Sequence, residues 1–363
     1  MAFPDSLHGI TLRSYQQNAT EAAMGATQGI IISPTGSGKT VTALELIRRR
    51  GQRTLIMLDS NALAKQWVDV IRKRLAIVAG RIGDGNWTVG NHITVATAQT
   101  LNLRKSETAK LVASIGTIVI DECHIIPAET FAAVVGMFPA RYRYGFTATP
   151  NRSDGLNDMI NRLIGPTLAE VDEQDVLATG GIVSARIIAM DTGCRFPHVR
   201  VEDRRHGDFL AAIETDPGRN SMIVRLGSLH SKTRQTLILT DRTEHAETLS
   251  AMMPSAVLAH GKLPVAKKRL AFAQMESAPV VIGTKGLLGK GLDYSSWSCL
   301  IIASPISGET PLQQGIGRVV RGYPGKKDAL VIDLVDPHPY GFSSWKKRRA
   351  VYSRRGWPVS MNR

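Results

Sequence analysis

Two kinds of apolar pattern alternate along the chain. Short runs rich in β-branched residues are typical of buried strands, and segments with apolar residues every three or four positions are typical of amphipathic helices. In the first half, the expected strands are residues 29–32, 53–59, 92–98, 117–122 and 142–149, and the expected helices are residues 41–50, 61–75 and 128–138. Strands that alternate with helices predict a parallel sheet covered by helices on both faces.

The same alternation begins again in the second half and predicts a second α/β domain. Its expected strands are residues 236–240, 256–260, 278–284, 299–304 and 329–335, and its expected helices are residues 244–253, 264–275 and 311–321. We therefore expect four parts: a first domain at residues 1–165, a connecting segment at 166–216, a second domain at 217–342 and a tail at 343–363. One apolar run in the connecting segment, "GIVSARIIAM", is a candidate for an extra strand.

Charge adds a candidate partner to this picture. The 363 residues are 43% hydrophobic, which favours a globular fold, and their net charge is +14. Residues 1–172 carry +4 of it and residues 173–363 carry +10. Such an excess indicates a polyanionic partner such as nucleic acid, although a basic protein without that partner would show the same charge.

Targeting and redox signals are few. The three cysteines are far apart and give no metal or disulfide pattern, which fits a reducing compartment. The start, "MAFPDSLHGI", does not resemble a secretory signal, and no apolar run reaches the ~18 residues that span a bilayer. We expect a cytoplasmic protein with no membrane partner.

The stretch "ISPTGSGKT" follows an apolar run and precedes a predicted helix. Its glycines let backbone N–H groups turn toward a ligand, and the helix N-terminus favours an anion. Lys39 can then reach the outer phosphates of a nucleotide, while the Thr40 hydroxyl can bind Mg²⁺. Ser33 stands where the strict pattern has glycine or alanine. The expected nucleotide-binding residues of this loop are Thr35, Gly36, Ser37, Gly38, Lys39 and Thr40.

Two adjacent carboxylates end the apolar run "TIVIDE". We expect Asp121 to hold Mg²⁺ and Glu122 to polarise the attacking water. Alone, such a pair would more often be a solvated strand end, but together with the phosphate loop it predicts phosphoanhydride hydrolysis.

The motifs "DECH" and "FTATP" resemble motifs II and III of superfamily 2 helicases. "FPARYRYGFTATPNRSDG" is similar to the XPB-like, UvsW-like and type III restriction-motor branch. This resemblance implies two tandem RecA-like domains with an ATP site in the cleft between them. It also implies that Gln16, with Arg13 nearby, recognises adenine, whereas an exposed helix residue is the plainer reading of Gln16.

The resemblance assigns further roles in both domains. His124, Thr147 and Thr149 would couple hydrolysis to movement. "QQGIGRVVR" matches the family's Q-x-x-G-R-x-x-R, so Gln314, Arg318 and Arg321 would act in catalysis. On a helix these three positions share one face, from which an arginine can stabilise the charge of the γ-phosphate.

The remaining motifs imply contacts with ribose and with nucleic acid. "VIGTKGLLGKGLD" resembles motif V, in which Gly291 and Asp293 would lie near the ribose; Lys290 departs from the acidic residue or alanine common in relatives. The expected nucleic-acid contacts are Gln66, Thr97, Gln99, Thr240, Arg242 and Thr284.

These parts predict an ATP- and Mg²⁺-dependent DNA helicase or translocase. Its partners would be single-stranded, duplex or forked DNA and a replication, recombination or repair protein. Two alternatives remain: a nucleic-acid clamp that ATP only switches, and an RNA helicase. The tail, "SSWKKRRAVYSRRGWPVSMNR", has aromatic residues among seven basic ones, which fits either nucleic-acid contact or packing on the second domain.

Overall fold

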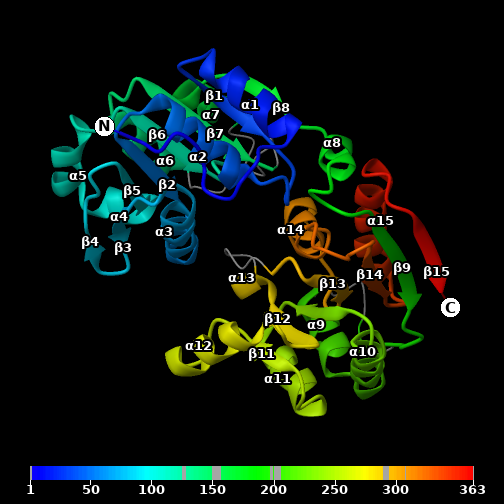
Figure 1. The fold of residues 1–363 in the computed structure, drawn as a ribbon. Helices are drawn as coiled ribbons and strands as arrows, with labels where there is room; N and C mark the ends of the chain where they lie inside the picture. The colour runs from blue at the N-terminus through cyan, green and yellow to red at the C-terminus, as the bar shows by residue number, and fades with distance from the viewer. Residues whose placement is uncertain are drawn as a thin grey trace. The chain divides into compact units, whose positions relative to one another are not determined.

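The structure is a computed structural model that describes residues 2–124, 128–148, 157–196, 199, 206–288, 294–306 and 308–362. It divides into two compact units, unit 1 (Met1–Gly181) and unit 2 (Ile182–Arg363). Each unit is an α/β layer structure, as the hydrophobic pattern predicts (Figure 1).

Unit 1 contains an eight-stranded sheet of order β4-β3-β5-β2-β6-β7-β1-β8. All pairs are parallel except β3 with β4. The strands are β1 (Gln28–Ile32), β2 (Thr54–Leu58), β3 (Gly80–Gly83), β4 (Asn86–Trp87), β5 (Ile93–Thr97), β6 (Thr117–Asp121), β7 (Tyr142–Thr147) and β8 (Thr167–Glu170). Its centre is buried, because the strands β2, β5 and β6 expose none of their residues.

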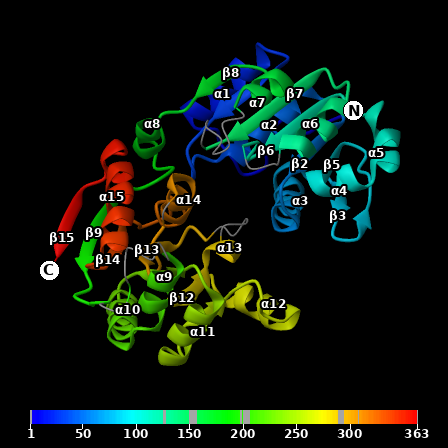
Figure 2. The same ribbon diagram turned by 180° about the vertical axis from the view of Figure 1, so that it is seen from behind.

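Helices cover both faces of this sheet (Figures 1 and 2). They are α1 (Ser14–Met24), α2 (Lys39–Arg50), α3 (Asn61–Leu75), α4 (Ala98–Leu103), α5 (Lys105–Val112), α6 (Ala128–Met137), α7 (Asn157–Ile164) and α8 (Glu173–Ala178). One core cluster joins alternate strand residues, including Ile30 and Ile118, to Val134 of α6 and Ile164 of α7. The residues between them, such as Ile31, point to the opposite face, where they are also buried.

Unit 2 contains a seven-stranded, all-parallel sheet of order β11-β12-β10-β13-β14-β9-β15. The strands are β9 (Ala185–Asp191), β10 (Gln235–Thr240), β11 (Val257–Ala259), β12 (Val280–Thr284), β13 (Trp297–Ile302), β14 (Ala329–Val335) and β15 (Val359–Asn362). The helices are α9 (His206–Thr215), α10 (Pro217–His230), α11 (Thr243–Met252), α12 (Val265–Gln274), α13 (Lys285–Leu288), α14 (Glu309–Val319) and α15 (Pro339–Arg354).

The segment expected as a connection, residues 166–216, is divided between the two sheets. It supplies β8 to the edge of the first sheet and β9, which contains most of the candidate strand "GIVSARIIAM", to the second. Each strand is hydrogen-bonded to its own unit. The boundary between the compact units falls after Gly181, within this segment.

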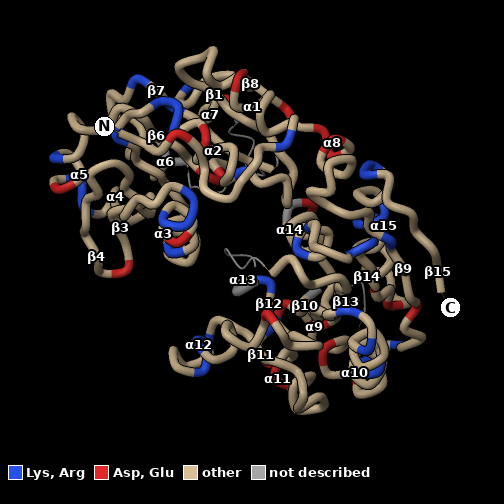
Figure 3. Tube along the Cα trace, in the orientation of Figure 1, with Lys and Arg blue, Asp and Glu red and all other residues tan. Residues whose placement is uncertain are grey.

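The basic tail packs on unit 2. In α15, Trp345 and Tyr352 are buried, and Arg348 is only 2% exposed. Nε of Arg348 lies 2.8 Å from Oδ2 of Asp333, and the Tyr352 hydroxyl donates to the same oxygen at 2.7 Å. The packing alternative is thus confirmed for these aromatic residues. Basic residues are grouped along α15 and α3, as the colouring of Figure 3 shows.

No helix in the described ranges is both long and apolar enough to cross a membrane.

Candidate functional site

The phosphate loop lies between β1 and α2, as predicted. Gly36 and Gly38 have φ angles of 90° and 81°, in the left-handed region that glycine adopts without strain. A Cβ on Gly38 would lie 2.5 Å from Nε2 of Gln16. Lys39 is the first residue of α2, so the loop delivers its N–H groups to a helix N-terminus. Ser33 takes part in the loop as well, because its hydroxyl donates to Oγ of Ser37 at 2.6 Å.

Helix α1 braces this loop from outside. The Ser37 carbonyl accepts hydrogen bonds from the Tyr15 hydroxyl at 2.8 Å and from Nε2 of Gln16 at 2.9 Å. Oε1 of Gln16 accepts from the Arg13 backbone N–H at 3.0 Å. Gln16 is buried, so it is not an exposed helix residue. The side-chain amide makes one hydrogen bond through its nitrogen and one through its oxygen, so each atom can make one more. Recognition of adenine by Gln16 stays a prediction.

Three neighbouring strands bring the expected catalytic groups together. In the order β6-β7-β1, the strands end at Asp121, at Thr147 and just before the loop. Nζ of Lys39 lies 3.3 Å from the Ser33 carbonyl oxygen and 3.4 Å from Oε1 of Glu122. Carboxyl ends of neighbouring parallel strands are the usual place for ligands in such sheets. The predicted lysine and carboxylates therefore form one cluster.

Glu122 has an unusual backbone conformation. Its φ angle is 49°, which is rare for a residue with a side chain and costs conformational energy. The turn lets its N–H donate to Oδ1 of Asp121 at 3.0 Å, while its side chain extends toward Lys39. Strain of this kind is common where function fixes a side chain.

Asp121 is 7% exposed and lies at the end of β6. Nε1 of Trp67 donates to its Oδ2 at 2.9 Å. Burial, and then the adjacent Glu122 carboxylate, raise the pKa of Asp121 to about 6, although Lys39 and the Trp67 N–H act in the opposite direction. Two carboxylates held this close form an anionic site beside the phosphate loop.

His124 and Thr147 are in contact, and their role in coupling stays a prediction. Nδ1 of His124 lies 2.7 Å from Oγ1 of Thr147 and 3.5 Å from Oε2 of Glu122. A path of contacts therefore runs from the Glu122 carboxylate to the end of β7. Thr149 lies outside the described residues.

The expected nucleic-acid residues of unit 1 differ in exposure. Gln99 is exposed and Gln66 is half-buried, so both amides can reach a ligand. Thr97 is buried, and its Oγ1 lies 2.8 Å from Oγ1 of Thr100. The Thr97 side chain is thus occupied inside the unit.

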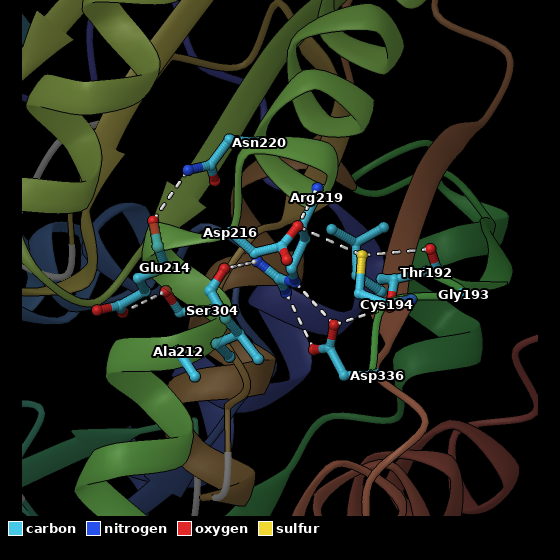
Figure 4. A network of polar contacts seen from close by, with 12 residues as sticks. Thr192, Gly193, Cys194, Ala212, Glu214, Asp216, Arg219, Asn220, Ser304 and Asp336 are labelled. Carbon is cyan, nitrogen blue, oxygen red and sulfur yellow. Dashed lines mark hydrogen bonds and ion pairs between the residues drawn. The ribbon is translucent and has the colours of Figure 1, made fainter. Parts of the chain in front are cut away.

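Thr240 is fully buried at the end of β10. Its hydroxyl lies 2.7 Å from Nδ1 of His245 and 2.8 Å from Oγ of Ser304. Ser304 in turn donates to Oε1 of Glu214 at 3.0 Å (Figure 4). A phosphate contact by the Thr240 side chain, as the resemblance implied, does not fit this arrangement, because the hydroxyl is held in a closed network.

The same network supports Arg242, whose side chain is 45% exposed. Nε of Arg242 lies 3.4 Å from Oε2 of Glu214. Burial raises the pKa of Glu214, while the Ser304 hydroxyl and Arg242 lower it. Thr284, the third expected contact in unit 2, is buried at the end of β12. Arg242 is therefore the expected contact of this unit whose side chain is open to a ligand.

Figure 4 also shows a second buried group of contacts, around Arg219 and Asp336. Nε and Nη2 of Arg219 donate to the two oxygens of Asp336 at 2.7 and 3.1 Å, and the Thr192 hydroxyl donates to Asp336 at 2.9 Å. The backbone N–H of Arg219 donates to Asp216, the N-cap of α10, at 2.7 Å. These bonds join β9, α10 and the end of β14, so we assign them to the fold of unit 2.

The motif at α14 is only partly helical. Gln314 and Arg318 lie in α14, but the helix ends at Val319, and Arg321 forms an isolated antiparallel bridge with Ile182. The expectation that all three side chains share one helix face was wrong for Arg321. Two β-branched valines end the helix, and Gly322 and Pro324 follow. Burial lowers the pKa of both arginines to about 10, so both are charged at neutral pH.

Gly291 and Asp293, expected near the ribose, lie outside the described residues.

Known proteins resemble this chain along most of its length. The family described as "Type III restriction enzyme, res subunit" matches residues 9–152. "Probable helicase D10" of Escherichia phage T5 is 28% identical over 336 residues, which cover 90% of this chain and 72% of the phage protein. "DNA 3'-5' translocase XPB2" of Sulfurisphaera tokodaii is 35% identical over 166 residues, or 46% of this chain and 37% of that protein.

These matches support a superfamily 2 helicase of the XPB and restriction-motor type. Among solved structures, "S. cerevisiae Dbp5 bound to RNA and ADP BeF3" aligns with a TM-score of 0.71 at 15% identity, covering 96% of this chain and 90% of that one. That likeness shows the fold: two parallel-sheet domains of a tandem RecA-like helicase core. The matched residues cover 37% of XPB2 and 54% of a second archaeal relative, "Putative DNA 3'-5' helicase Rad25" of Halobacterium salinarum, so the activities of those longer proteins are not assigned to this chain.

Sequence reasoning missed several residues of this candidate site. Tyr15 and Trp67 touch the phosphate loop and Asp121 from α1 and α3, and Glu214 stands behind Arg242. Both aromatic residues occupy apolar positions of amphipathic helices, and at such positions the sequence pattern predicts a packing role. Trp67 directly follows Gln66, so that adjacency was the only signal available.

Proposed function

We propose that this chain is an ATP-dependent motor that moves on or remodels DNA. The observation that carries the proposal is the cluster in unit 1. There, the Lys39 ammonium lies between the Ser33 carbonyl and Glu122, next to the buried Asp121. Phosphoryl transfer needs positioning and charge stabilisation more than covalent help, and this cluster offers both. The names of the phage and archaeal relatives, a helicase and a DNA translocase, support motion on DNA.

The residues present fit a magnesium ion. Asp121 is buried and Glu122 is partly exposed, and their carboxylates belong to adjacent residues. Burial first, and then repulsion from the Glu122 carboxylate, raise the pKa of Asp121 to about 6. A divalent cation would offset that repulsion. Mg²⁺ usually takes one or two protein oxygens and completes its shell with phosphates and water. Asp121 and the Thr40 hydroxyl would supply the protein oxygens, and the ion would neutralise charge on the nucleotide phosphates.

The other residues of unit 1 receive distinct roles. The N–H groups of the loop, from Thr35 to Thr40, would hold the phosphates, and Lys39 would reach the outermost one. Glu122 would then orient the attacking water and accept its proton. Gln16, with Arg13 beside it, would recognise adenine. In the described conformation Lys39 and Glu122 contact each other, so nucleotide binding must separate this ion pair.

For unit 2 we propose that Gln314, Arg318 and Arg321 act in ATP hydrolysis. Both arginines keep their charge at neutral pH. A guanidinium that meets the γ-phosphate stabilises the transition state, which here would link hydrolysis to both units. Arg321→Ala should lose hydrolysis and keep its affinity for ATP. Turnover at the wild-type rate in that variant would remove this role.

Nucleic acid would contact exposed amides and cations. Gln66 and Gln99 of unit 1 and Arg242 of unit 2 are the expected contacts that remain open. Such groups bind phosphates and sugars, which position a strand without reading its sequence. The basic excess of the chain favours the same partner.

The test is ATP turnover in five conditions: no polymer, single-stranded DNA, duplex DNA, forked DNA and RNA. Strong stimulation by one DNA form is expected and would identify the preferred track. Glu122→Gln is the control, because it should bind ATP and hydrolyse little. If this variant turns over normally, the role of Glu122 is wrong.

Strand displacement separates the motor from an ATP-switched clamp. A motor displaces a labelled strand or a bound protein only while ATP is hydrolysed, whereas a clamp only changes its affinity. Stimulation by RNA alone would overturn the choice of DNA. Turnover that no polymer changes would contradict the coupling itself.

A further inference from the structure

Trp67 joins the helix that carries Gln66 to the carboxylate proposed to hold magnesium. Its indole N–H donates to Oδ2 of Asp121 at 2.9 Å, across 54 residues of sequence. Both side chains are buried, with Trp67 3% exposed and Asp121 7% exposed. An indole has a single hydrogen-bond donor, and in Trp67 this donor binds a carboxylate.

This bond fixes the rotation of the Asp121 carboxylate. Oδ1 accepts the Glu122 backbone N–H at 3.0 Å, and Oδ2 accepts the Trp67 indole. Each oxygen has a second lone pair, so the carboxylate can still bind a ligand while two donors set its plane. Hydrogen bonds from surrounding groups orient metal ligands in this way and are energetically important to metal binding.

Helix α3 is suited to pass on a displacement. Its 15 residues begin at the N-cap Ser60, whose hydroxyl accepts from the Leu63 N–H at 3.4 Å. The helix is buried along one side only, through Ala64, Trp67, Ile71 and Leu75. Gln66, the residue before Trp67, is half-buried and reachable from outside. A ligand that displaces the backbone at Gln66 would also displace the indole, because both residues belong to one turn of a hydrogen-bonded helix.

We propose that Trp67 is a positioning residue: it holds the Asp121 carboxylate in its magnesium-binding orientation and transmits nucleic-acid binding on α3 to that carboxylate. The proposal rests on the proposed function, since it explains how a polymer on unit 1 would stimulate hydrolysis in the same unit. A buried indole N–H needs an acceptor in any role, and here that acceptor is the carboxylate proposed to hold magnesium.

Trp67→Phe separates these two readings. The phenyl ring keeps most of the apolar packing and removes the N–H donor. Trp87→Phe is the matched control: Trp87 lies in β4 of the same unit, and the Arg104 guanidinium covers its ring at 4.4 Å. Thermal unfolding of both variants shows whether each is folded before any other measurement is interpreted.

The first readout is the indole N–H resonance of tryptophan labelled with ¹⁵N. The chain has five tryptophans, and the peak that Trp67→Phe removes belongs to Trp67. We expect this peak to shift on addition of Mg²⁺ with ADP, and also on addition of a single-stranded DNA oligonucleotide without nucleotide. The Trp87 peak should stay in place under Mg²⁺ with ADP. A Trp67 peak that ignores both additions would overturn the proposal. If Trp67→Phe misfolds, the Trp67 peak is assigned by replacing the other four tryptophans one at a time.

The second readout is the magnesium dependence of nucleotide binding and of turnover. In Trp67→Phe, the half-saturating Mg²⁺ concentration should rise about tenfold, as expected for the loss of one hydrogen bond to a charged group. Nucleotide affinity in EDTA should not change, and stimulation by DNA should fall. If Trp67→Phe matches Trp87→Phe in all three measurements, Trp67 is only a packing residue. Failure of the proposed function looks different: the wild-type chain itself would then show no DNA-stimulated turnover.

Discussion

The two units have similar α/β architectures, but their expected site residues differ in accessibility. In unit 1, Lys39 follows the loop after β1 and meets Glu122, which lies next to Asp121 at the end of β6. In unit 2, Thr240 and Thr284 lie at corresponding strand ends but are buried. In each unit, polar residues thus lie at the carboxyl ends of parallel strands. Whether such a residue is accessible depends on its side chain, charged or hydroxyl.

Charge explains much of this difference. A buried carboxylate or ammonium needs a partner of opposite charge, so Lys39 and Glu122 stay together near the loop surface. A threonine hydroxyl needs only one or two hydrogen bonds, which His245 and Ser304 supply to Thr240 inside the unit. A strand-end hydroxyl is therefore weaker evidence for a ligand contact than a strand-end charge.

The largest effect should come from the unit 1 cluster. Lys39→Ala removes the ammonium beside the loop, so ATP turnover should fall about 100- to 1000-fold, the range for losing one preorganised charge-stabilising group. Steady-state phosphate release measures this. Lys110→Ala, on the exposed side of α5, is the matched control and should keep wild-type turnover. A small loss in Lys39→Ala would remove the cluster from catalysis.

The next effect is on the stability of unit 2. Arg348→Met leaves Asp333 buried beside Tyr352 without its cation, which should lower the free energy of unfolding by about 3–5 kcal/mol. Hydrogen exchange followed by mass spectrometry should show faster exchange in β14 and not in the sheet of unit 1. Arg354→Met is the control, since its ion pair with Glu309 is largely exposed and worth little. Equal effects of the two variants would contradict the account of α15.

A smaller effect should separate charge from hydroxyl in unit 2. Arg242→Ala should weaken DNA binding several-fold and lower the slope of log affinity against log salt by about one, as for one lost phosphate contact. Thr284→Val keeps the shape of the buried side chain and should bind like wild type. Fluorescence anisotropy at several salt concentrations measures both. Equal weakening by the two variants would break the comparison between the units.

The smallest effect concerns pH. Burial, with a contribution from Arg219, lowers the pKa of His245 to about 3 from its usual 6.5. Between these values the unfolded chain binds a proton that the folded one does not, so the stability of unit 2 should fall as the pH drops from about 6.5 toward 3. Denaturant midpoints across this range measure the slope. His245→Gln should flatten it, whereas His8→Gln, an exposed change in unit 1, should not.

Much of the fold could be predicted from the sequence, because buried parallel strands appear in it as continuous apolar runs. Every expected strand core is present, and so are the phosphate loop and the carboxylates beside it. The strands β3, β4, β8 and β15 have two to four residues each, and they were missed because they are short and polar in part. The contacts of Trp67 and Glu214 were missed for another reason: they join segments distant in sequence, and no local pattern encodes such a pairing.

The position of β9 sets an order of events for the newly made chain. Its neighbours in the sheet are β14 and β15, and Ala185 pairs with Ala329. The sheet of unit 1 is complete once β8 has been synthesised, whereas β9 waits for strands that the ribosome adds much later. Unit 1 should therefore fold while unit 2 is still being made, and β9 is the segment that most needs protection from wrong pairing during that interval.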